Sequence, residues 1–270
     1  MAGPGIKLLN NVTRASTTGS TRNVILLHGL LGNHRNLYGL APFVRKHANA
    51  IFADLRNHGA SFHSQDDGVS SHVEDLAALV RSVGGKVSVI GHSFGGRVAM
   101  EFALKYKEAL ESLVILDISP RKFSPTEREE LSTIGYIRAL QAIDLSLGRE
   151  WVESEILRMA GNKSLSDFFR TNLIESGGAL SWRVNFPAIL SSFPSNFSFD
   201  YSKSQFTGPS LVIFGTESEF RVGEDRAEFE KFFPSIVMKS VKAGHWLHAE
   251  KPQEVGGLIE AHLAALETKS

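Results

Sequence analysis

Short apolar runs alternate with amphipathic stretches along most of the chain. The apolar runs predict strands at Val24–Leu27, Ala50–Asp54, Val87–Ile90, Leu113–Asp117, Ser210–Phe214 and Ile236–Val241. The stretches between them predict helices at Asn36–His47, Ser70–Val83, Phe94–Lys107, Gly223–Phe232 and Pro252–Leu266. This alternation predicts an α/β fold with a mostly parallel central sheet flanked by helices.

The rhythm breaks after Asp117. From Ser119 to about Gln205 the chain reads as several helices separated by prolines and glycines, among them the pair Gly177-Gly178. We therefore predict a core formed by residues 1–118 and 208–270, with residues 119–207 as an all-helical cap. Such a cap would cover the carboxyl ends of the strands, where open α/β sheets bind ligands. Four phenylalanines near its end read more as packing than as substrate wall, namely Phe186, Phe193, Phe197 and Phe199.

Composition narrows the class of protein. The 270 residues are 42% apolar and 21% charged, with 29 basic and 29 acidic side chains, so nothing indicates a nucleic-acid surface. The absence of cysteine excludes disulfides, thiolate catalysis and zinc–sulfur sites. No apolar run is long enough to span a bilayer, and no secretory h-region is present.

The beginning of the chain resembles an organellar transit peptide, because the first 53 residues contain no Asp or Glu and residues 13–22 are rich in Ser and Thr. We favour the alternative in which residues 6–16 form a first strand. The expected location is intracellular, mitochondrial or cytoplasmic, and not secreted.

The most informative stretch is the end of the third predicted strand. Val87–Ile90 runs into Gly91-His92-Ser93-Phe94-Gly95, which is G-x-S-x-G, and a predicted helix follows. In this strand–turn–helix context a serine becomes an exposed nucleophile. The tightness of the turn predicts a strained backbone at Ser93 and leaves no room for a Cβ at Gly91 or Gly95.

A serine hydroxyl needs a base to take its proton and an acid to orient that base. With this turn the chain order is Ser, then Asp or Glu, then His. His245 lies between the last predicted strand and the last predicted helix, and we predict it as the base in preference to His248, which reads as structural.

Asp117 ends the strand next to the one that carries Ser93, and we predict it as the acid. The more common place for the acid is the loop after the following strand, three residues beyond a glycine. This chain has Ser218 there, with Glu217 and Glu219 on either side. Either glutamate therefore stays open as an alternative acid.

An oxyanion hole needs two backbone N–H groups. We predict that Phe94, after the nucleophile, supplies one. The loop His28-Gly29-Leu30-Leu31-Gly32 supplies the other, from Leu30 with Leu31 as second choice.

No cofactor and no metal site is expected. Gly-x-Gly-x-x-Gly is absent, and pairs such as His72 with Glu74 lack the spacing and ligand count of a metal centre.

These motifs resemble the α/β-hydrolase superfamily. Narrower matches are Asp54-Leu55-Arg56-Asn57-His58-Gly59, Asp117-Ile118-Ser119-Pro120, Trp182-Arg183-Val184-Asn185 and Gly244-His245-Trp246-Leu247-His248-Ala249-Glu250-Lys251-Pro252. Together they resemble the small esterases of the α/β-hydrolase domain-containing protein eleven and bacterial YbfF type. The resemblance implies Asp117 as the acid, hydrolysis of acyl esters or thioesters, no cofactor, and a mitochondrial or bacterial cytosolic setting.

The sequence thus predicts a serine hydrolase that cleaves a small-molecule acyl ester or thioester through Ser93, Asp117 and His245 and an acyl-enzyme. An acyltransferase would use the same residues with another acceptor. A slow-turnover ligand receptor, or a protective partner of another protein, is the alternative from a different class. No nucleic-acid partner is expected.

Overall fold

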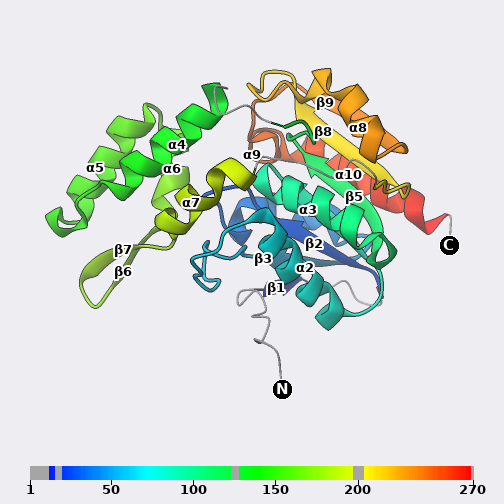
Figure 1. Ribbon diagram of the computed structural model, residues 1–270, viewed down its shortest axis with the longest axis horizontal. Helices are drawn as coiled ribbons and strands as arrows, with labels where there is room; N and C mark the ends of the chain where they lie inside the picture. The colour runs from blue at the N-terminus through cyan, green and yellow to red at the C-terminus, as the bar shows by residue number, and fades with distance from the viewer. Residues whose placement is uncertain (1–11, 16–19, 123–127, 197–203, 269–270) are drawn as a thin grey trace.

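The computed structural model describes residues 12–15, 20–122, 128–196 and 204–268 (Figure 1). This part of the chain forms a seven-stranded sheet in the order β1-β3-β2-β4-β5-β8-β9. All neighbouring strands are parallel except β1, which pairs antiparallel with β3. The strands are β1 (Val12–Ala15), β2 (Asn23–Leu27), β3 (Asn49–Ala53), β4 (Val87–His92), β5 (Leu110–Leu116), β8 (Ser210–Gly215) and β9 (Ile236–Val241). The predicted strands are confirmed and differ only at their ends. Of the first strand, predicted over residues 6–16, residues 6–11 and 16 lie outside the described residues.

Helices cover both faces of the sheet. One face carries α2 (Val69–Val83), α3 (Phe94–Lys105) and α8 (Arg226–Phe232), with the 3-10 turns η2 (Lys107–Ala109) and η4 (Val222–Glu224). The other face carries η1 (His34–Leu40), α1 (Ala41–Val44), α9 (Leu247–Glu250) and α10 (Pro252–Glu267). In Figure 1, α2 and α3 lie in front of the strands and the red α10 lies behind them.

The strand pleat divides the apolar side chains between two core clusters. Ile25 and Val89 pack toward α2 and α3, whereas their neighbours Leu26 and Ile90 pack toward α1 and α10. Both faces of the central strands are therefore buried, which explains why these strands appear in the sequence as continuous apolar runs.

The predicted helix Asn36–His47 is not continuous: the 3-10 segment η1 is followed by the single turn α1. Pro42 lies in the first turn of α1. Because proline has no N–H and its ring clashes with the carbonyl four residues earlier, an α-helix cannot run through this position, but a helix can start there.

The segment between β5 and β8 contains α4 (Arg128–Gln141), η3 (Leu145–Leu147), α5 (Arg149–Ala160), α6 (Lys163–Arg170), β6 (Leu173–Ser176), β7 (Ala179–Trp182) and α7 (Phe186–Asn196). The prediction that this insertion is all-helical is wrong, because β6 and β7 form an antiparallel hairpin. Its two turn residues, Gly177 and Gly178, have φ values of 58° and 79°. Two successive residues with positive φ suit the tight turn that joins two strands, so this glycine pair forms a hairpin instead of separating helices.

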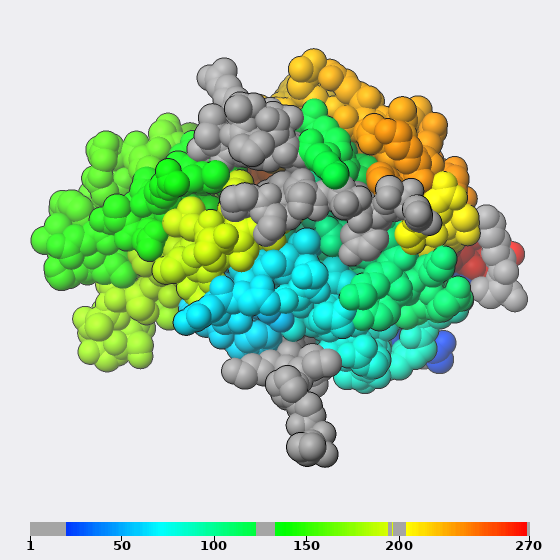
Figure 2. All heavy atoms as spheres, in the orientation of Figure 1, coloured from blue at the N-terminus to red at the C-terminus, as the bar shows by residue number. Residues whose placement is uncertain are grey.

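We call α4 to α7 the cap segment. It has its own apolar cluster, in which Phe186 and Phe193 are buried as the packing interpretation predicted. Phe197 and Phe199 lie outside the described residues. The cap segment extends to one side of the sheet in Figure 1, and in Figure 2 the yellow-green atoms of α7 lie against the cyan residues that lead into α2.

Candidate active site

Ser93 lies between β4 and α3 with φ 51° and ψ −120°, so the predicted strain at this turn is present. Its backbone N–H donates to the carbonyl of Leu116, which fixes the turn against the end of β5. A Cβ on Gly91 would lie 2.3 Å from the carbonyl oxygen of Gly95, and one on Gly95 would lie 2.5 Å from that of His28. Only glycine fits at these two positions, and the half-buried Ser93 is held at the carboxyl end of the sheet.

The structure brings Asp117 and His245 into direct contact. Nδ1 of His245 lies 2.8 Å from Oδ2 of Asp117, and because the carboxylate carries no proton, the imidazole N–H donates. Asp117 is fully buried, and its Oδ1 accepts a 2.8 Å hydrogen bond from the backbone N–H of Gly215. The hydroxyl of Ser218 donates to Oδ2. The carboxylate therefore keeps its charge in a dry site through three donors.

Glu217 and Glu219, the alternative acids, have exposed side chains. Neither side chain makes a hydrogen bond or ion pair within the part of the chain that the structure describes. The position three residues after Gly215 is instead occupied by Ser218, which contacts Asp117. The spacing after Gly215 pointed to position 218 in the sequence, but it did not indicate that the hydroxyl of Ser218 would bind Asp117.

The ring of Phe220 stacks on that of His245, with centroids 4.2 Å apart and an interplanar angle of 23°. This aromatic neighbour was not predicted, because its contact joins two loops that are distant in sequence. The loop of His245 is also fixed from the other side, since the N–H of Gly244 donates to a carboxylate oxygen of Glu250 at 2.9 Å.

Two further histidines lie against the candidate base. Nε2 of His92 lies 2.9 Å from the backbone carbonyl of His245, and the ring of His92 contacts those of His245 and His248 at 4.8 and 4.3 Å. Burial, together with the neighbouring imidazoles of His248 and His245, holds the pKa of His92 well below its ordinary value. Burial and the nearby His245 lower the pKa of His248 to about 3. His248 thus has the buried, structural position that its place in the sequence suggested.

The hydroxyl of Ser93 makes no hydrogen bond to His245 or to any other residue among those described. Catalytic hydrogen bonds are often long in a free enzyme and shorten when the substrate binds, so the absence of this bond is compatible with a nucleophile at Ser93 and a base at His245. The two are linked through His92, which precedes Ser93 and contacts the ring and backbone of His245.

The loop expected to supply an oxyanion donor runs beside Ser93, because a Cβ on Gly29 would lie 3.2 Å from the Cβ of Ser93. Leu30 is half-buried, and its N–H has no acceptor in the described part of the chain. Leu31 has a left-handed φ of 59°. Phe94 follows Ser93 as the first residue of α3. Both predicted N–H donors therefore lie near the serine.

The cap segment holds this loop. Nδ2 of the buried Asn172 donates to the carbonyl of Leu31 at 2.7 Å, and Nδ2 of Asn33 donates to the hydroxyl of Thr171 at 3.2 Å. Leu31 is also part of the cap segment's apolar cluster, against which Leu30 packs. The position of the cap segment and the shape of the loop are therefore coupled.

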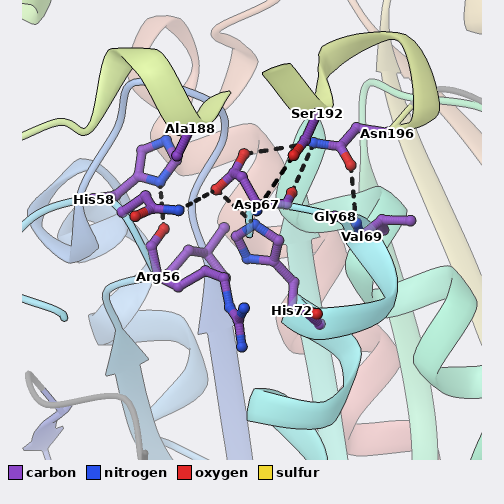
Figure 3. A network of polar contacts seen from close by, with 12 residues as sticks. Arg56, His58, Asp67, Gly68, Val69, His72, Ala188, Ser192 and Asn196 are labelled. Atoms are coloured by element: carbon purple, nitrogen blue, oxygen red, sulfur yellow. Dashed lines mark hydrogen bonds and ion pairs between the residues drawn. The ribbon is translucent and has the colours of Figure 1, made fainter. Parts of the chain in front are cut away.

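A second junction joins the cap segment to the core through buried polar groups (Figure 3). Asn196, at the end of α7, donates to the backbone carbonyl of Asp67 and accepts from the N–H of Val69, each at 2.9 Å. Oδ1 of Asp67 lies 3.2 Å from Nε2 of His72. Burial alone would raise the pKa of Asp67, but the hydrogen bonds from His72 and Asn57 and the electrostatic influence of His72 and His58 together hold the pKa below its ordinary value. The ring of His72 in turn contacts that of Phe94 edge-on at 4.9 Å.

Two of the four motifs that resemble the small esterase group, residues 54–59 and 182–185, meet at the same junction. Asn57, with φ 63°, accepts at its backbone carbonyl from the N–H of Asn185 at 3.0 Å, and the two side chains bond at 3.1 Å. Their shared role is to attach α7 to the core. No group of three or more His, Asp or Glu side chains that could hold a metal ion occurs among the described residues. None of the described helices is long and apolar enough to cross a membrane.

A family model described as "alpha/beta hydrolase fold" matches residues 22–252. The mouse protein "sn-1-specific diacylglycerol lipase ABHD11" is 31% identical over 252 residues, which cover 89% of this chain and 80% of the mouse protein. "Esterase YbfF" of Escherichia coli is 27% identical over 255 residues, covering 93% and 97%. "Probable alcohol acetyltransferase" of Saccharomyces cerevisiae is 29% identical over 256 residues, covering 86% and 74%. Among solved structures, "Marine microorganism esterase" is 28% identical with a TM-score of 0.85, covering 92% of this chain and 97% of its own.

Proposed function

The chain belongs to the α/β-hydrolase family, and we propose that it is a serine esterase whose triad is Ser93, His245 and Asp117. The observation that carries the proposal is the 2.8 Å contact between His245 and the buried carboxylate of Asp117, beside the strained turn at Ser93. These are the nucleophile, base and acid of acyl transfer in the chain order that this fold uses.

In the proposed reaction the hydroxyl of Ser93 attacks the ester carbonyl while Nε2 of His245 takes its proton. Asp117 holds the imidazole by Nδ1 and stabilises the imidazolium that forms. The N–H groups of Phe94 and Leu30 donate to the oxyanion of the tetrahedral intermediate. The imidazolium then protonates the leaving alcohol, and the acyl-enzyme remains. Water attacks the acyl-enzyme while His245 takes its proton, and the imidazolium returns a proton to Ser93 as the free acid leaves.

We propose that the substrate is an acyl ester with an apolar chain. Leu30 and Leu31, beside the proposed oxyanion donors, and Trp246, next to the proposed base, all pack with the cap segment's apolar cluster. The ring of Trp246 lies 5.8 Å from that of Phe168 on α6. The name of the mouse relative, a diacylglycerol lipase, supports a diacylglycerol-like lipid as the first substrate to try.

A second candidate function is transfer of the acyl group to an alcohol. The similarity to the yeast relative, whose name states a probable alcohol acetyltransferase, favours it. The acyl-enzyme is the same in both reactions, so the ratio of ester product to free acid, measured with an added alcohol, separates them.

The same proposal includes the division of the chain into a core of residues 1–118 and 208–270 and a cap of residues 119–207.

It also includes an intracellular location, mitochondrial or cytoplasmic. Subcellular fractionation of cells that express the full chain would test the location.

The experiment is labelling of the wild type, Ser93→Ala and Asp117→Asn with a fluorophosphonate probe, alongside hydrolysis of p-nitrophenyl esters of increasing chain length. We expect Ser93→Ala to abolish labelling and Asp117→Asn to lower kcat by about 10⁴-fold, as when a triad acid is neutralised. Melting temperatures of the variants control for misfolding. A wild type that neither labels nor hydrolyses would contradict the proposal and favour a ligand receptor or protective partner on the same fold.

A further inference from the structure

One loop, between β8 and η4, contacts both the proposed acid and the proposed base. From this loop the N–H of Gly215 donates to Oδ1 of Asp117 at 2.8 Å, and the hydroxyl of Ser218 donates to Oδ2. Oδ2 is also the oxygen that accepts from His245. Ser218 is 8% exposed and Asp117 0%, so water has little access to this contact.

The proton of the Ser218 hydroxyl has a defined direction. Its oxygen accepts a 3.2 Å hydrogen bond from the N–H of Phe220, which leaves the single hydroxyl proton for the carboxylate. The loop therefore presents a donor whose orientation is set by its own backbone.

The same loop places an aromatic ring on the base. Phe220 stacks on His245 at 4.2 Å, and its carbonyl accepts from the guanidinium of Arg121 at 3.3 Å, which fixes the loop beyond the ring. A stacked ring restricts rotation of the imidazole.

We propose that Ser218 and Phe220 are positioning residues for acyl transfer: the hydroxyl fixes the carboxylate of Asp117, and the ring holds the imidazole of His245 toward Ser93. This inference rests on the proposed function. Neither side chain touches the reacting atoms; one acts through the acid and the other through the base.

The hydroxyl has an electrostatic consequence. A hydrogen bond to the carboxylate shares part of its negative charge, so without Ser218 the carboxylate would hold the imidazolium of His245 more strongly. The base would then need a higher pH to become neutral. Besides Asp117, the titratable groups among the described residues that face His245 are the imidazoles of His92 and His248, which the substitution leaves in place.

The test compares Ser218→Ala, Ser218→Thr and Phe220→Leu with Thr216→Ala, by measuring kcat and KM for a p-nitrophenyl ester across the pH range. Thr216 is the matched control, because it lies in the same loop but is exposed, and its hydroxyl makes no hydrogen bond to another described residue. We expect Ser218→Ala to lower kcat by about 10-fold to 100-fold, the size expected for one hydrogen bond to a charged group. The acid limb of kcat/KM should move to higher pH.

Ser218→Thr keeps the hydroxyl and should restore both kcat and the pH profile. Phe220→Leu should lower kcat by about 2-fold to 10-fold with KM unchanged. If Ser218→Ala unfolds, as its melting temperature would reveal, the comparison of Phe220→Leu with Thr216→Ala decides.

Two failures are distinguishable. Wild-type turnover that does not depend on Ser93 would overturn the proposed function and this inference with it. Turnover that depends on Ser93 but has the same kcat and pH profile in the Ser218→Ala and Thr216→Ala variants would overturn this inference alone.

Discussion

Lowering the pH from 7.5 to 5.0 should destabilise the fold, because several imidazoles are buried with lowered pKa values, and those of His28 and His248 give the clearest case. Nδ1 of His28 lies 2.8 Å from the carbonyl of Gly29, and its Nε2 accepts from the N–H of Leu55 at 3.0 Å. A second proton on the ring would break the bond to Leu55. Burial, with the neighbouring His58, lowers the pKa of His28 to about 3. Burial and His245 lower that of His248 to about 3.

The sign follows from the direction of these shifts. In the unfolded chain each ring takes up a proton below its ordinary pKa of 6.5, whereas in the folded protein it does not until about 3. The contribution to stability is therefore fully present above pH 6.5 and is lost as the pH falls from 6.5 toward 3. At pH 5.0 each ring costs about 1.5 × 1.36, or roughly 2 kcal/mol. The sum of about 4 kcal/mol is a large part of the roughly 5–15 kcal/mol that holds a typical domain folded.

The assay is urea unfolding at pH 7.5, 6.0 and 5.0, followed by tryptophan fluorescence. His248→Leu removes one of the two rings, so the loss of unfolding free energy between pH 7.5 and 5.0 should shrink by about 2 kcal/mol. His63→Gln is the control, because its side chain is exposed. An unchanged pH dependence in His248→Leu would refute the reasoning.

Three further predictions concern single contacts. Gly29→Ala would place a Cβ 2.9 Å from Nδ1 of His92, so the loop that carries Leu30 must shift. We expect kcat/KM for an ester to fall by about 100-fold, the effect of losing one oxyanion donor. Activity within twofold of wild type would contradict this. Asn196→Ala removes two buried hydrogen bonds at the start of α2 and should lower the free energy of unfolding by about 1–3 kcal/mol, measured by denaturation against the wild type. Glu217→Gln and Glu219→Gln should each change kcat by less than about twofold, because exposed carboxylates with no partner among the described residues contribute little. A large loss of kcat in either variant would contradict the assignment of Asp117 as the acid.

The sheet was predictable because its strands are buried on both faces. Most residues of β4 and β5 are therefore apolar on both faces, and two buried exceptions, Ser88 and Ser112, hydrogen-bond to each other. The nucleophile turn was predictable for a related reason. Gly91 and Gly95 are demanded by backbone contacts within a few residues and by the adjacent loop, so the constraint is visible in a short motif.

The cap segment was less predictable because its elements depend on packing between distant segments. Gly177-Gly178 can separate two helices or close a hairpin, and only the pairing of Leu173 with Trp182 decides between them. The choice of acid posed the same difficulty. The sequence favoured Asp117 but left Glu217 and Glu219 open; in the fold the chain turns Asp117 inward with φ 52° and leaves both glutamates at the surface.

The imidazole of His92 contacts those of His245 and His248, and burial makes the three rings unequal as acceptors of a proton. His92 and His248 are buried, which lowers the pKa of each, and neither has a carboxylate partner within the described residues. His245 has Asp117. A proton taken from Ser93 would leave an uncompensated charge on either neighbour, at a high cost in a dry site. The three histidines are therefore unequal in the fold, and under the proposed function His245, which has the carboxylate partner, serves as the base.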